Sequence, residues 1–81
     1  MKPLALSEVY QLLEPGPVVL LLTLGRLCLQ QELWGKAQSY LQASLSEQPS
    51  RSAHVALAQL FDRIGKPEDA NRHYRASAFT A

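Results

Sequence analysis

Apolar residues recur three and four positions apart along most of the chain, and no segment alternates apolar and polar residues as a half-buried strand does. The pattern predicts five helices, over residues 4–14, 17–31, 34–47, 51–64 and 67–79. Only a few residues separate one helix from the next, and such short connections make consecutive helices antiparallel neighbours. The sequence therefore predicts an all-α fold of stacked helix hairpins.

Residues typical of helix ends lie at the expected boundaries. Pro17 and Pro67 suit the first turn of a helix, and the acidic pair after Pro67 suits the positive end of the helix dipole. Ser50 is expected to cap the start of the helix over 51–64. Gly65 is expected to end that helix in a left-handed conformation.

The chain also resembles itself at an offset of 33 residues, with large residues falling on large ones and small residues on small ones. The matched pairs are Leu24/Leu57, Gly25/Ala58, Leu27/Leu60, Cys28/Phe61, Ala37/Ala70, Leu41/Tyr74 and Ser44/Ser77. Small residues at Gly25 and Ala37, and at their counterparts, let two helices approach closely, while the large residues fill the space beside them. A hairpin of this kind buries its apolar face by stacking on another.

This spacing resembles the tetratricopeptide repeat, whose pattern combines Leu-Gly, aromatic residues, two alanines and a closing proline. The first copy runs through Leu21, Leu24, Gly25, Cys28, Ala37, Leu41, Ser44 and Pro49. The second copy runs through His54, Leu57, Ala58, Phe61, Gly65, Ala70, Tyr74 and Ser77. Cys28 and His54 depart from the family pattern. The resemblance implies a right-handed α-solenoid with a remnant helix and linker over 1–17, one repeat over 18–50 and a truncated repeat over 51–81, and Tyr10, Leu13 and Pro15 would end the remnant.

Two longer strings, "LLLTLGRLCLQQELWGKAQSYLQASLSEQPS" (20–50) and "ALAQLFDRIGKPEDANRHYR" (56–75), resemble a more particular group. They are similar to the C-terminal end of the HemY family, proteobacterial membrane-anchored tetratricopeptide proteins associated with haem biosynthesis. The resemblance implies a parent protein held at the bacterial inner membrane by N-terminal helices that precede this chain. It also implies a partner among the enzymes of the haem pathway.

Composition excludes several classes of function. The formal net charge is +1, whereas a nucleic-acid-binding domain of this size carries a clear basic excess. The most apolar run, residues 18–29, is shorter than the roughly 20 residues of a membrane span and contains Arg26. We therefore expect a soluble fragment. The single cysteine, Cys28, excludes an internal disulfide.

Soft ligands for a cofactor or metal are few. Cys28 occupies a packing position, and a free cysteine there is usually a small buried hydrophobic residue. His54 also lies where the repeat packs, whereas His73 lies beside Arg72 on the expected outer face of its helix. We therefore expect no cofactor and no metal, with haem or porphyrin binding through these residues as an alternative.

No constellation typical of an enzyme occurs in the sequence. A Ser/His/Asp arrangement, a GxSxG motif and a phosphate-binding loop are all absent, and Glu68 with Asp69 is explained by a helix start. Trp34 is interpreted as covering the turn between two helices. A non-catalytic protein is therefore predicted.

The first helices of stacked hairpins together form a concave face that binds partners. Its members here are Val19, Leu22, Thr23, Arg26, Gln30, Ser52, Val55, Ala56, Gln59, Asp62 and Arg63. Four of these eleven residues are apolar, and the strip suits a helix or extended segment of another protein whose acidic groups meet Arg26 and Arg63. The predicted function is a protein-interaction scaffold. Alternatives are that the strip packs against missing parts of the parent, or joins copies of the chain into a homo-oligomer.

Overall fold

The structure is a computed structural model that describes residues 16–80. Four helices occur there: α2 (Pro17–Gln30), α3 (Trp34–Glu47), α4 (Arg51–Arg63) and α5 (Pro67–Ala78). The prediction of an all-α fold is confirmed for this part of the chain, and each boundary lies within one residue of its predicted position. The helix predicted over residues 4–14, and the remnant unit to which it was assigned, lie outside the described residues.

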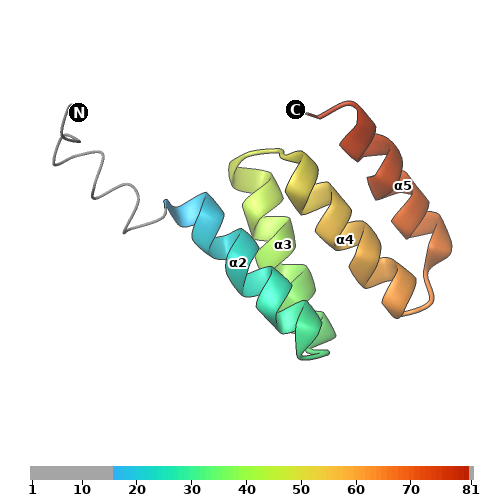
Figure 1. Cartoon of the computed structure of the whole chain (residues 1–81), viewed down its shortest axis with the longest axis horizontal. Helices are drawn as coiled ribbons and strands as arrows, with labels where there is room; N and C mark the ends of the chain where they lie inside the picture. The colour runs from blue at the N-terminus through green and yellow to red at the C-terminus, as the bar shows by residue number, and fades with distance from the viewer. Residues whose placement is uncertain (1–15, 81) are drawn as a thin grey trace, which may run out of the picture.

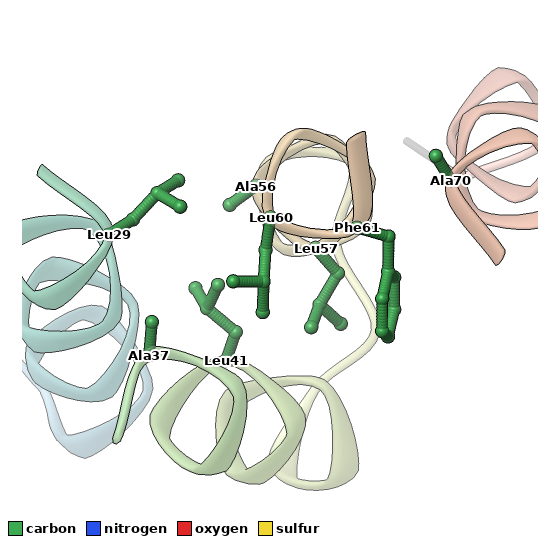
Figure 2. Close-up of a cluster of buried hydrophobic side chains, with 8 residues drawn as sticks. All are labelled: Leu29, Ala37, Leu41, Ala56, Leu57, Leu60, Phe61 and Ala70. Atoms are coloured by element: carbon green, nitrogen blue, oxygen red, sulfur yellow. The ribbon is translucent and has the colours of Figure 1, made fainter. Parts of the chain in front are cut away.

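The helices form two hairpins that stand side by side (Figure 1). The first hairpin pairs α2 with α3, and the second pairs α4 with α5. Helix α3 also packs against α4, and α2 reaches α4 directly. Figure 2 shows α3 on one side of the core and α2 and α4 on the other. The first helices of the two hairpins are therefore neighbours.

The predicted helix ends are confirmed. The Ser50 hydroxyl accepts a hydrogen bond from the Ala53 N–H at 3.1 Å, as an N-cap does. Pro17 and Pro67 each begin a helix. Gly65 adopts a φ of 78°, and the N–H of Lys66 donates to the carbonyl of Phe61 at 2.8 Å. These last two features together form a Schellman motif at the end of α4.

The end of α2 has the same geometry. Glu32 adopts a φ of 61°, and the N–H of Leu33 donates to the carbonyl of Cys28 at 2.9 Å. Glu32 lies 33 residues before Gly65, so the two turns match at the offset found in the sequence. A left-handed conformation is costly for a residue with a Cβ atom, and here the two hydrogen bonds of the turn, from Glu32 N–H to the carbonyl of Leu29 and from Leu33 N–H to the carbonyl of Cys28, support it.

The core lies between the two hairpins. Its buried members are Leu29, Ala37, Leu41, Ala56, Leu57, Leu60, Phe61 and Ala70 (Figure 2). Leu41, Leu57 and Leu60 are fully buried. Removing a side chain of this kind typically costs about 2–5 kcal/mol, so these three leucines contribute much of the stability.

Small residues make the close helix approaches that the sequence predicted. Gly25, Ala37, Ala58 and Ala70 are all buried. A Cβ atom on Gly25 would lie 2.6 Å from both Cγ and Cδ2 of Leu41, so α2 and α3 meet where only glycine fits. Ser44 and Ser77, expected as small packing residues, are buried as well.

Tyr74 departs from the prediction, since it was expected to fill space as its counterpart Leu41 does. Leu41 is fully buried, whereas Tyr74 is 39% exposed. Leu41 lies between α2 and α4, while α5 is the last described helix and Tyr74 has no further helix packed on it.

No helix within the described part of the chain is long and apolar enough to cross a membrane.

Candidate interaction groove

A groove of about 230 Å³ lies between the first helices of the two hairpins. Helix α2 contributes Arg26, and α4 contributes the remaining wall. The α4 residues that line it are Arg51, Ser52, Val55, Ala56 and Gln59. Spacings of three and four residues place these positions on one face of a helix. The small residue Ala56, only 3% exposed, lies where Leu29 of α2 points toward α4 (Figure 2).

The groove combines two cations with a partly apolar floor. Arg26 and Arg51 are exposed, and neither forms an ion pair with another described residue. Val55 is half-buried, and Ala56 is buried. Guanidinium groups bind carboxylates through paired, charge-assisted hydrogen bonds. The arrangement can therefore hold an acidic side chain while apolar atoms of the same segment contact the floor.

Five of the predicted concave residues meet in this groove, and three meet in a neighbouring hollow. Arg26, Ser52, Val55, Ala56 and Gln59 line the groove. Gln59 also lines the second hollow, of about 360 Å³, together with Asp62, Arg63, Leu29 and Tyr74. The two spaces thus share Gln59 and follow α4 along its length.

The charged residues of the second hollow already have partners. Arg63 lies 3.8 Å from Glu32 and places its guanidinium 5.8 Å from the centre of the Trp34 ring. The Tyr74 hydroxyl donates to Asp62 at 3.0 Å, and this hydrogen bond raises the pKa of Tyr74 above its ordinary value. Arg63 is therefore less available to a partner than the sequence interpretation assumed.

The remaining predicted residues line neither space. Leu22 packs against the core, and the Thr23 hydroxyl donates to the carbonyl of Val19 at 2.8 Å within its own helix. Val19 is 53% exposed, and Gln30 is the exposed last residue of α2. The structure therefore places the groove beside the C-terminal half of α2, where Arg26 lies.

Arg51 was missed by the sequence interpretation. It is the first residue of the helix predicted over 51–64 and was not included in the concave strip. Arg51 nevertheless lies four residues before Val55, and side chains four apart share a helix face. That spacing was the signal that would have placed Arg51 on the concave strip.

His73 was misplaced by the sequence interpretation, because it does not lie on an outer face, whereas His54 is half-buried at the packing position expected for it. Nδ1 of His73 lies 3.1 Å from Nδ1 of His54, and the His73 ring stacks on Phe61 with centroids 5.5 Å apart. Burial lowers the pKa of His73, with further lowering from His54 and Arg72 and an opposing effect of Asp69. Helical spacing within one helix could not reveal this pair, since its members come from α4 and α5.

Cys28 behaves as predicted, since it is half-buried against the core. Trp34, the first residue of α3, is half-buried against the same core. Within residues 16–80, no three groups of His, Cys, Asp or Glu gather in one place.

Comparisons with protein-family models, with curated proteins and with solved structures found no match to this chain. The resemblances to the tetratricopeptide repeat and to the HemY family therefore remain predictions from the sequence. What the chain does must be argued from its own geometry.

Proposed function

We propose that this chain is a non-catalytic protein-interaction module built from tetratricopeptide-like repeats. Two observations support the repeat. Buried small residues recur at the predicted offset, and the turns at Glu32 and Gly65 share one hydrogen-bond pattern. In such a stack the first helices of successive hairpins present one continuous surface to a partner. Here those helices are α2 and α4.

The partner we propose is a helix or extended segment of another protein that carries acidic residues. The observation that carries this proposal is the groove shared by α2 and α4, with Arg26 and Arg51 on its walls and Val55 and Ala56 in its floor. The cations fix the position of the segment, and apolar contact with the floor supplies affinity. The module would act as a scaffold, holding the segment without changing it chemically.

The resemblance to the HemY family supports a more particular setting. In that setting a longer parent is held at the bacterial inner membrane, and the bound segment belongs to an enzyme of the haem pathway. This part of the proposal rests on the quoted sequence strings alone. It is tested by the identity of the bound protein rather than by the groove.

Affinity capture tests the proposal with two matched variants. Arg26→Glu/Arg51→Glu reverses both groove charges, whereas Lys66→Glu/Arg75→Glu makes the same change in charge on residues of neither α2 nor α4. A partner that uses the groove is retained by the wild type and the control and is lost from the groove variant. Equal retention by all three forms would show that partners bind elsewhere. Circular dichroism checks that both variants keep the fold.

Self-association is a second candidate, favoured by the exposed face of α2. Leu20 is 49% exposed and Leu27 is 51% exposed, whereas their counterparts Ala53 and Leu60 are fully buried in α4. A face that is covered in one repeat and open in the other suits contact with a second copy. Analytical ultracentrifugation would then show a molar mass that rises with concentration, and Leu20→Glu/Leu27→Glu would stay monomeric. A wild-type molar mass that stays at the monomer value across concentrations excludes this candidate.

A further inference from the structure

The histidine pair joins the two helices of the second hairpin at a point away from the groove. His54 comes from α4 and His73 from α5, and the Nδ1 atoms lie 3.1 Å apart with ring centroids 5.4 Å apart. Both side chains are half-buried, so solvent reaches them. They are the only histidines in the chain. The pairing therefore depends on the tertiary fold and not on neighbouring positions in the sequence.

This separation is close to that of two imidazole nitrogens on one metal ion. Zinc–nitrogen bonds of about 2.0–2.1 Å and a separation of 3.1 Å correspond to a nitrogen–metal–nitrogen angle of about 95–102°. That angle lies between the octahedral and tetrahedral values.

The surroundings hold one ring in position and leave open coordination sites. Phe61 stacks on His73 with an interplanar angle of 14°, which restricts rotation of that ring away from its partner. Imidazole is a preferred ligand of zinc, copper, nickel and cobalt. A third protein ligand is not gathered at the pair in the described part of the chain, so water or an external donor completes the coordination. Asp69 adds a nearby negative charge, and Arg72 opposes it.

We propose that His54 and His73 chelate one divalent transition-metal ion through their Nδ1 atoms, and that Zn²⁺ is a suitable probe. The bound ion replaces the hydrogen bond between the rings and cross-links α4 to α5. Both imidazoles are neutral in this state, with their protons on Nε2. The site is independent of the proposed groove, because neither histidine lines it.

Isothermal titration calorimetry of the tag-free chain with ZnCl₂ at pH 7.5 tests the proposal. One ion per chain is expected, and His54→Ala and His73→Ala should each weaken binding by at least about tenfold. Cys28→Ser should bind as the wild type does, because Cys28 packs against the core in the other hairpin. Binding should also weaken as pH falls toward 5, since protons compete for the imidazoles.

A second measurement keeps the test valid if an alanine variant unfolds. In histidine-selective NMR spectra of the wild type, Co²⁺ should shift or broaden the imidazole signals of both residues together. The proposal is overturned if Zn²⁺ does not bind at on the order of 1 mM. It is equally overturned if binding persists in a folded His54→Ala/His73→Ala variant, or if Co²⁺ perturbs only one histidine.

Discussion

Replacing Gly25 by alanine tests the close approach of α2 and α3. An added Cβ atom would lie 2.6 Å from Cγ and Cδ2 of Leu41 and 3.3 Å from its backbone nitrogen. Leu41 is fully buried between α2, α3 and α4, and Cγ is the branch point of its side chain. Neither a rotamer change nor a small helix shift therefore relieves the contact easily. The substitution must move a central core residue.

Two opposing effects set the magnitude. Alanine in place of glycine inside a helix contributes about 0.8–1.0 kcal/mol of stability. Overpacking a close-packed core costs typically about 1–3 kcal/mol. Since the contact involves two atoms of a side chain that cannot relax outward, we expect overpacking to prevail. Gly25→Ala should lower the free energy of unfolding by about 1 kcal/mol.

Gly35→Ala provides the matched control. Gly35 lies in the first turn of α3, and a Cβ atom there meets nothing within 4 Å. This substitution should raise the free energy of unfolding by about 0.4–1 kcal/mol, because it only restricts the unfolded chain and favours the helix. Urea denaturation followed by circular dichroism measures both variants, with equal slopes expected for the two transitions.

The essential result is that Gly25→Ala and Gly35→Ala change the free energy of unfolding in opposite directions. A Gly25→Ala variant at least as stable as the wild type would refute the packing argument, because the propensity gain would then be the whole effect. A double-mutant cycle sharpens the test. In a Leu41→Ala background the clashing atoms are gone, so Gly25→Ala should become neutral or stabilising there.

Four further predictions follow from single contacts. Glu32→Gly should raise the free energy of unfolding by about 0.5–1 kcal/mol, since it relieves a left-handed conformation and loses only an exposed ion pair. If urea denaturation instead shows a lower free energy of unfolding, the Glu32–Arg63 contact matters more than the backbone conformation. Ser50→Ala should lower the free energy of unfolding by about 1 kcal/mol through loss of the cap. An unchanged midpoint of urea denaturation would show that the cap is unimportant. Leu57→Ala should lower the free energy of unfolding by about 2–5 kcal/mol, because Leu57 is fully buried. A loss below about 1 kcal/mol would show that this side chain contributes little to the core. In the folded chain the pKa of His73 lies below its ordinary value of 6.5, so as pH falls the unfolded chain binds the proton first. The midpoint of urea denaturation should therefore fall as pH falls through about 6.5. His73→Phe should flatten this pH dependence, and an equal dependence in that variant would assign it to other groups.

The helices were predictable because their signals are local. Proline at Pro17 and Pro67, the cap at Ser50 and glycine at Gly65 each act within one turn of the chain. The first three begin a helix and Gly65 ends one, all where expected. The 33-residue offset then predicted which small residues are buried between helices, and Gly25, Ala37, Ala58 and Ala70 are all buried.

The candidate site was less predictable because it depends on contacts between helices. Helical spacing put Arg26 and the α4 face on one strip, and both line the groove, but the pairing of Arg63 with Glu32 and Trp34 joins separate elements. The meeting of His54 and His73 likewise depends on how far α5 is rotated against α4. Spacing within one helix carries no information about that rotation.

The most direct test of the proposed function is the affinity of acidic peptides for the wild type and the two charge variants. Peptides of about 15 residues, selected from a displayed random library against the wild type, would be labelled and titrated by fluorescence anisotropy. We expect selected peptides rich in Asp and Glu, with affinity reduced by about tenfold or more in Arg26→Glu/Arg51→Glu. Affinity should stay within about twofold in Lys66→Glu/Arg75→Glu. Equal losses in both variants, or none in either, would contradict a partner site in the α2/α4 groove.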